Sequence, residues 1–108
     1  MRSALPALFG VLLWGCGIPV PPDKQDFVGT WRGAGVTLVI TPEGRVDYKR
    51  VRGSVTKTLS APLRAFEGDD LVVGIPGITT IFIAERRPFQ DGGDWKMLMD
   101  SVELVRAP

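Results

Sequence analysis

The sequence predicts an all-β domain, a small antiparallel meander of about eight strands that follows an N-terminal signal segment. The chain after residue 26 carries short runs of β-branched and alternating residues, which is the pattern of half-buried strands. Turn-forming groups separate these runs at regular intervals. No window after the signal segment repeats with the period of a helix. Such a meander closes into a barrel or folds as a sandwich, and the pattern leaves both open.

Residues 1–15 have the parts of a secretory signal. Arg2 is the only charge before Asp23, and an apolar stretch runs through residues 4–14. This stretch is too short to span a bilayer, which requires about 20 apolar residues. Gly15 then supplies the small residue that precedes a cleavage site. We therefore expect a signal peptide that is absent from the mature protein.

The signal segment ends in the run Leu13-Trp14-Gly15-Cys16, which holds the only cysteine of the chain. This run resembles the lipobox of bacterial lipoproteins, although Trp14 stands where that family usually has a smaller side chain. The resemblance implies that Cys16 becomes the mature N-terminus and carries a diacylglycerol and a palmitate-like chain. Two or more acyl chains anchor a protein firmly in a membrane. Acylation also explains a lone cysteine in an oxidising compartment. The alternative is an ordinary signal peptide cut near Gly15 or Gly17.

Residues 16–26 are expected to form a tether between the lipid and the domain. Three prolines, Pro19, Pro21 and Pro22, favour an extended spacer. Gly17 follows the cysteine, and the lipoprotein resemblance implies the outer membrane because an aspartate at this position usually retains such proteins in the inner membrane. The folded domain is expected to cover residues 27–108.

The first strands are expected in residues 27–31, 36–41 and 45–51, the last two joined by a turn at residues 41–44. Val46 and Tyr48 alternate with polar neighbours in the third of these runs. Further strands are expected at residues 55–59, 63–66, 71–73, 79–85, 95–99 and 102–106. The turns between them are expected at residues 67–70, 76–77, 91–94 and 100–101.

Gly29 and Trp31 form a Gly-x-Trp motif near the start of the first strand. This motif is similar to the lipocalin signature, in which the tryptophan packs across one barrel end beneath an arginine from a late strand. The resemblance implies that Arg106 takes the arginine's place as a cation–π partner. The alternative is that Trp31 is an ordinary core aromatic. Because the domain is about half as long as a lipocalin, we expect a filled core.

Composition argues against an enzyme. The chain has no histidine, which excludes Ser-His-Asp and Cys-His arrangements and the usual zinc sites. Asp69 and Asp70 are neighbours in a turn, and the acids of residues 91–94 are too few for a calcium site. We expect no metal, cofactor or catalytic residue. Thirteen basic and twelve acidic residues give a net charge of +1, which gives no reason to expect nucleic acid.

Several residues are candidates for contact with a ligand or partner. A basic cluster along one hairpin is either a solvated face or a site for lipid phosphates or an acidic partner, and Arg50 shares its parity with Val46 and Tyr48. The cluster consists of Arg45, Lys49, Arg50, Arg52 and Lys57, with Arg64, Arg86 and Arg87 as its possible extension. An apolar segment around a Pro-Gly turn is either core or an exposed interaction surface. Met97 and Met99 are expected in the core. The candidate contact residues are Trp31, Tyr48, Arg50, Ile75, Ile78 and Phe82.

Three functions remain open from the sequence. The preferred one is a membrane-anchored lipoprotein of the bacterial envelope that acts as a non-catalytic binding module. The second is a carrier of a small hydrophobic ligand in a lipocalin-like barrel. The third is an inhibitor of an enzyme that attacks the envelope, with the loop at residues 75–78 as the inserting element. The expected partners are the membrane through Cys16, and an envelope protein or small ligand.

Overall fold

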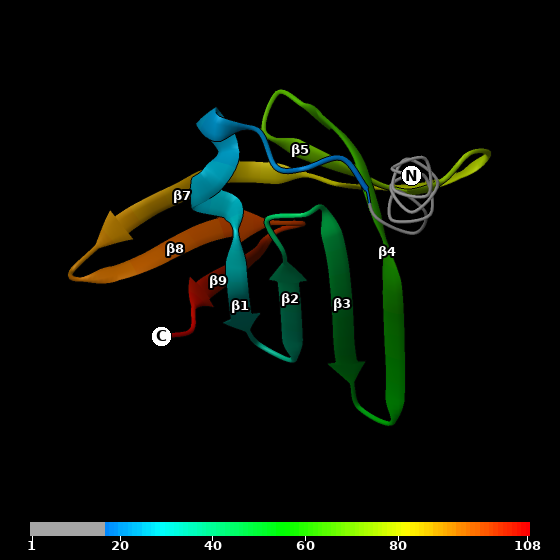
Figure 1. The fold of residues 1–108 in the computed structure, drawn as a ribbon. Helices are drawn as coiled ribbons and strands as arrows, with labels where there is room; N and C mark the ends of the chain where they lie inside the picture. The colour runs from blue at the N-terminus through cyan, green and yellow to red at the C-terminus, as the bar shows by residue number, and fades with distance from the viewer. Residues whose placement is uncertain (1–16) are drawn as a thin grey trace, which may run out of the picture.

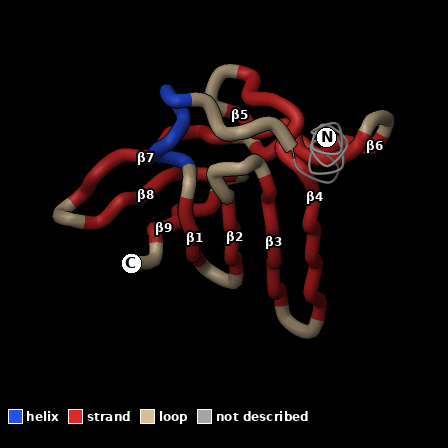
Figure 2. The backbone as a smooth tube through the Cα atoms, in the orientation of Figure 1, coloured by secondary structure: helices blue, strands red, loops and turns tan. Residues whose placement is uncertain are grey.

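The computed structural model describes residues 17–108, so the signal peptide and Cys16 lie outside the described residues. The described chain contains nine strands and one short 3₁₀ helix (Figures 1 and 2). In chain order these are η1 (Pro22–Phe27), β1 (Gly29–Gly33), β2 (Val36–Ile40), β3 (Arg45–Arg52), β4 (Val55–Glu67), β5 (Asp70–Ile75), β6 (Ile78–Phe82), β7 (Ala84–Asp91), β8 (Asp94–Met99) and β9 (Val102–Arg106).

All the strands belong to one antiparallel sheet with the order β6-β5-β4-β3-β2-β1-β9-β8-β7. The sheet curls into a half-barrel (Figure 1), so the barrel alternative is correct and the sandwich is not. The first and last strands meet where Trp31 lies opposite Arg106. The two edges of the sheet, β6 and β7, are separated in the chain by Ile83 alone. One bent segment therefore forms both edges.

Strand β4 is longer than the sequence predicts. Residues 55–59 and 63–66 belong to one strand of 13 residues that runs through Pro62. The β4–β5 ladder begins only at the pair Leu63–Val73, after Pro62. On the opposite side of β4, which faces β3, the N–H of Leu63 donates to the Gly44 carbonyl. The missing N–H of Pro62 therefore removes no ladder hydrogen bond, and the strand continues.

The segment predicted as one strand at residues 79–85 is divided at Ile83, and β7 continues to Asp91. Pro88 lies in this continuation, and a proline argues against a central strand. In the structure β7 is an edge strand, and its pairing with β8 is irregular on both sides of Arg86. An irregular edge tolerates a residue without an N–H, so the strand forms despite Pro88.

The inner side of the curled sheet is filled by apolar side chains. Alternation along β2 buries Val36, Leu38 and Ile40 and leaves the residues between them half-buried. Met97 and Met99 are buried as expected. The largest side chains with less than 2% exposure are Trp31, Phe27, Leu38, Ile40, Leu63, Leu71, Met97, Leu104, Val46 and Val73. Each contributes about 1.5–3 kcal/mol relative to an exposed position.

The proline-rich segment lies against the half-barrel from Ile18 onward. Ile18 donates its N–H to the Leu63 carbonyl at 3.0 Å, and Val20 donates to Pro42 at 2.9 Å. The segment then forms η1, so the expectation of no helix after the signal segment is wrong. Pro22 opens this helix with a fixed φ, and a 3₁₀ turn this short lacks the 3.6-residue period that marks an α-helix.

Candidate functional site

Trp31, Trp95 and Arg106 form a stack where the first and last strands meet. Trp31 is fully buried and donates its Nε1–H to the Phe27 carbonyl at 2.9 Å. The guanidinium carbon of Arg106 lies 5.1 Å from the centre of the Trp31 ring and 4.9 Å from that of Trp95. Both distances are within cation–π range. Trp31 thus has the arginine neighbour that the resemblance implied, and no exposed surface with which to contact a ligand.

Gly29 has a steric role in this stack. Its φ of +142° is a conformation that side-chain-bearing residues rarely adopt. A Cβ at this position would lie 3.2 Å from Cγ and Cδ of Arg106. The glycine of the Gly-x-Trp motif therefore lets the arginine stem pass close to the backbone on its way to Trp31.

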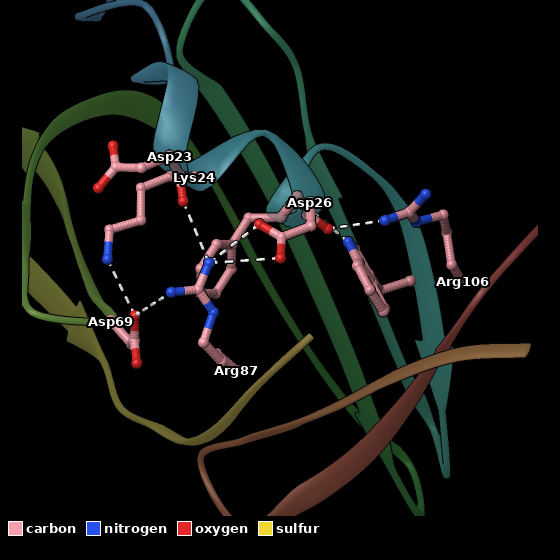
Figure 3. Close-up of polar contacts among 8 residues, drawn as sticks. Asp23, Lys24, Asp26, Asp69, Arg87 and Arg106 are labelled. Carbon is pink, nitrogen blue, oxygen red and sulfur yellow. Dashed lines mark hydrogen bonds and ion pairs between the residues drawn. The ribbon is translucent and has the colours of Figure 1, made fainter. Parts of the chain in front are cut away.

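A polar cluster, which we call the η1 clasp, consists of Lys24, Asp26, Asp69 and Arg87 (Figure 3). Lys24 Nζ lies 2.9 Å from Asp69 Oδ1. Arg87 Nη2 lies 3.2 Å from Asp26 Oδ1, and its Nη1 lies 3.5 Å from Asp69 Oδ1. The clasp fastens η1 to β7 and to the β4–β5 turn. Sequence reasoning missed it because Lys24 and Asp26 belong to the segment expected to be a tether.

The polar groups of the clasp compensate one another. Each of its two cations faces a carboxylate, and Arg87 also donates to the Asp23 carbonyl at 3.1 Å. Beneath them, the Phe27 and Phe66 rings pack with their centres 5.3 Å apart. We therefore assign the clasp a structural role.

Three of the predicted contact residues come together in a second place, which we call the mouth hollow. It has a volume of about 250 Å³. The rings of Tyr48 and Phe82 lie at its wall with their centres 5.1 Å apart and tilted by 54°. Its lining residues come from β3, β4, β6 and the β8–β9 turn: Tyr48, Arg50, Lys57, Thr58, Leu59, Thr80, Phe82 and Asp100.

Two cations stand together at the mouth hollow. Arg50 lies directly opposite Lys57 in the β3–β4 ladder, and neither forms an ion pair with any of residues 17–108. Like charges in facing positions are unfavourable. The one acid of the lining, Asp100, accepts the Ile83 N–H at 2.8 Å through its Oδ1. The Arg50–Lys57 pair therefore has no ion-pair partner within residues 17–108, and Asp100 is the only acid that shares the lining with it.

Arg50 lies on the inner face of the sheet, as its alternation with Val46 and Tyr48 predicts. The β3–β4 ladder continues without a bulge to the pair Arg52–Val55, so Arg50 and Arg52 share the inner face with Val46, which is buried. The hairpin extends beyond the apolar core, and its residues past Lys49 are exposed or half-buried. This extension lets inward-facing cations reach water.

The remaining basic residues do not form one patch with Arg50. Arg45 lies 3.5 Å from Asp47 on the outer face. The Arg86 guanidinium stacks 3.6 Å from the centre of the Phe89 ring. Arg87 belongs to the η1 clasp. Of the expected basic cluster, Arg50, Arg52 and Lys57 thus share the inner face of the hairpin, and the other basic residues lie on separate faces.

A larger hollow of about 500 Å³ lies over β2, β3 and β4. Most of its lining side chains have the parity opposite to buried Leu38 and Val46, so it is an open trough on the outer face. Its acid, Asp47, accepts a hydrogen bond from Ser60 and lies close to Arg45. Asp47 and Ser60 are thus already partnered, and Lys49 is a single cation, whereas the mouth hollow joins two facing cations to a ring pair and is the better candidate site.

The β5–β6 hairpin exposes apolar side chains. Ile75 is 53% exposed and Ile78 is 71% exposed, so the expected exposed surface exists at this turn. Phe82 is not part of it, because it lies opposite Leu71 on the inner face and is only 2% exposed. Ile81 and Ile83 are exposed instead.

The fold is therefore that of an all-β half-barrel with an apolar interior and a cationic mouth. No protein-family model matches this chain, and comparison with curated proteins and with solved structures found no match. Within residues 17–108, no three acidic, cysteine or histidine side chains are grouped as metal ligands. No helix in this part of the chain is long and apolar enough to cross a membrane.

Proposed function

We propose that the chain is a membrane-anchored bacterial lipoprotein, acylated at Cys16, and that its half-barrel is a non-catalytic binding module of the cell envelope, held at the outer membrane. Its ligand is an anionic group joined to an apolar one, taken up at the mouth hollow. Phosphate-bearing amphiphiles of the envelope have this chemistry.

The proposal rests on two facing cations, Arg50 and Lys57, which form no ion pair with residues 17–108. They stand beside the ring pair of Tyr48 and Phe82. An anion between the two cations would remove their mutual repulsion and accept charge-assisted hydrogen bonds. The half-buried Tyr48 ring offers apolar surface to the rest of the ligand, and Phe82, only 2% exposed, packs behind it. A hollow of about 250 Å³ is smaller than the usual site for a drug-sized molecule. It suits a headgroup-sized fragment rather than a whole lipid.

The packing of the interior favours this surface site over a lipocalin-like carrier. A carrier needs an internal space for its ligand. The positions that would line such a space, including Trp31, Leu38 and Met97, are fully buried in one apolar cluster. A ligand would have to displace these side chains, whereas the mouth hollow is open.

Binding can be tested on the mature chain with decyl phosphate below its micelle concentration, and with decyl glucoside as the uncharged comparison. Titration calorimetry should give weaker binding of decyl phosphate to an Arg50→Gln/Lys57→Gln variant by about tenfold. Lys49→Gln is the control, since Lys49 lies on the same strand and faces outward. Equal affinity of the native chain and the double variant would overturn the mouth hollow as the site.

The anchor is tested separately by the intact mass of the protein extracted from membranes of a Gram-negative host. The expected mass is that of residues 16–108 with three acyl chains. A chain of this length without acyl mass would disprove the anchor.

A further inference from the structure

The β5–β6 hairpin belongs to the longest uncharged stretch of the folded domain. Residues 71–84 are fourteen consecutive positions without a charge, in a chain of which 23% is charged. Four isoleucines of this stretch are exposed by 45% or more: Ile75, Ile78, Ile81 and Ile83. A solvent-facing segment of this composition marks a contact surface.

The exposed isoleucines lie on both faces of the hairpin. Ile75 and Ile78 are opposite each other next to the Pro76-Gly77 turn, with the parity of buried Val73. Ile81 has the other parity and faces outward. The tip therefore carries its two isoleucines on the inner face, and the outer face has the Gly74–Thr79 pair next to the turn and Ile81 nearer the base of the hairpin.

The described chain begins beside this hairpin. Leu63 of β4 accepts the N–H of Ile18 along one edge and is paired with Val73 of β5 along the other. Neighbouring strands are about 4.8 Å apart, so Ile18 lies about 10 Å from Val73, two residues before Ile75. The start of the described chain and the hairpin tip also lie on the same side of the molecule in Figure 1. Ile18 itself is 41% exposed.

We propose that the β5–β6 hairpin enters the surface of a lipid bilayer, with Pro76-Gly77 leading and the side chains of Ile75 and Ile78 in the acyl boundary. This inference rests on the proposed function, because the acylated Cys16 directly precedes Gly17 and brings this side of the domain to the membrane. The inserted part is the uncharged turn with its two exposed isoleucines, which a bilayer surface can take up without burying a charged group.

A cation stands next to the patch at the level where lipid phosphates would lie. Arg64 follows Leu63, is exposed, and forms no ion pair with residues 17–108. A basic side chain at an anionic membrane surface contributes to binding through the surface potential. Arg64 is therefore available to a lipid phosphate near the base of the hairpin.

Backbone hydrogen bonding limits the depth of insertion. β6 is an edge strand, so one side of it carries N–H and C=O groups without ladder partners. Such groups cannot be placed in hydrocarbon. Only the turn and its two isoleucines reach the acyl region, by about 5–10 Å as for other interfacial segments, and the rest of β6 stays at headgroup level.

Tryptophan quenching tests the insertion in the full acylated protein. Ile78→Trp and Val55→Trp are compared in vesicles of phosphatidylethanolamine and phosphatidylglycerol with brominated acyl chains. Val55 is the matched control because it is 66% exposed and also follows a hairpin turn. We expect the bromine to quench the added fluorescence of Ile78→Trp at least about twofold more than that of Val55→Trp. Equal quenching of the two would overturn the proposal.

The intact mass of each preparation shows whether Cys16 is acylated, so the hairpin proposal and the anchor proposal are tested separately. Acylated protein in which Ile78→Trp is unquenched disproves the hairpin proposal and leaves the anchor intact. Preferential quenching of Ile78→Trp in protein without acyl mass supports the hairpin and disproves the anchor. If Ile78→Trp is unquenched and crosslinks instead to a second copy or to another protein, the surface serves that partner and the lipid proposal is wrong.

Partition of the unacylated chain gives a second readout. In a Cys16→Ser chain, Ile78→Asp should reduce cosedimentation with the same vesicles by about tenfold, because a charge replaces an apolar group at the acyl boundary. Val55→Asp should leave it unchanged. A thermal melt of each variant checks that its fold is retained, and equal partition of folded Ile78→Asp and native chains would contradict the insertion.

Discussion

Arg106 stands directly opposite Trp31 in the β1–β9 ladder, and its guanidinium carbon lies 5.1 Å from the centre of the Trp31 ring and 4.9 Å from that of Trp95. The same group donates to the Asp26 carbonyl at 2.7 Å (Figure 3). One side chain thus links the first strand, the last strand and η1. The Nε–H of Arg106 is buried without a hydrogen-bond acceptor. The contacts of the guanidinium with the two rings and with Asp26 therefore offset the cost of burying this unpaired donor.

Replacing Arg106 with lysine tests this linkage. A lysine keeps the charge and loses the planar group that stacks on the rings and reaches Asp26. We expect a loss of about 2 kcal/mol in the free energy of unfolding, measured by urea denaturation. Arg32→Lys, at an exposed arginine of β1, should change stability by less than about 0.5 kcal/mol. Equal effects of the two variants would contradict the stack.

Gly29→Ala should destabilise the fold through two causes. The residue has a φ of +142°, and the new Cβ would press on Arg106 at 3.2 Å. We expect a loss of about 2–3 kcal/mol in urea denaturation. Gly53→Ala isolates the backbone cause, because Gly53 has a φ of +61° with nothing within 4 Å of the added Cβ, and should cost about 1–2 kcal/mol. A Gly29→Ala protein as stable as the native one would refute the steric role.

The η1 clasp should contribute little and be sensitive to salt. The side chains of Arg87 and Asp26 are 42% and 29% exposed, and pairs of this kind have coupling energies below about 1 kcal/mol. A double-mutant cycle of Arg87→Met and Asp26→Asn, measured by urea denaturation, should give that value at low ionic strength. The coupling should shrink in about 1 M salt. A salt-independent coupling would show that packing, rather than charge, holds the helix.

Glu85 predicts a pH dependence of stability. Its carboxylate accepts the backbone N–H of Ser101 at 3.0 Å, which lowers the pKa of Glu85 from 4.5 in the folded state. A lowered folded pKa gives stability that is present above the unfolded pKa and is lost as the pH falls through the folded one. Glu85→Gln should therefore lower the urea midpoint at neutral pH and match the native protein well below pH 4.5.

The control for Glu85 is Glu43→Gln, since Glu43 is exposed in the β2–β3 turn. Its urea midpoint should follow the native one at both pH values. A Glu85→Gln deficit that persisted at low pH would mean that the glutamate acts through packing rather than through its charge.

Most of the strand pairs could be predicted because their signals are local, whereas the pairing of β1 with β9 and the separation of β6 from β7 could not. Alternating residues and turn groups follow one another along the chain, and a meander pairs each strand with its neighbours. The bend at Ile83 carries no such signal, because this isoleucine continues an apolar run. Its direction is set by distant groups: Asp100 bonds to both backbone groups of Ile83, and Asp70 accepts the Ala84 N–H.

The candidate site was predictable in part. Parity placed Arg50 beside Tyr48, and the ladder confirms their shared face. The opposing cation Lys57 depends on the register of the β3–β4 hairpin. The sequence also could not say which side of the apolar strand at residues 78–82 faces inward, because both sides carry large apolar groups. The pairing of Phe82 with Leu71 decides this.

The meeting of both sheet edges at Ile83 has a mechanical consequence. In most open sheets the two edge strands are not consecutive in the chain, so no short connection joins them. Here a single covalent joint spans the gap, and the carboxylates of Asp100 and Asp70 latch it. Because Phe82 and Asp100 both line the mouth hollow, the joint at Ile83 connects two of its lining residues: Phe82 is its neighbour in the chain and Asp100 is hydrogen-bonded to its backbone.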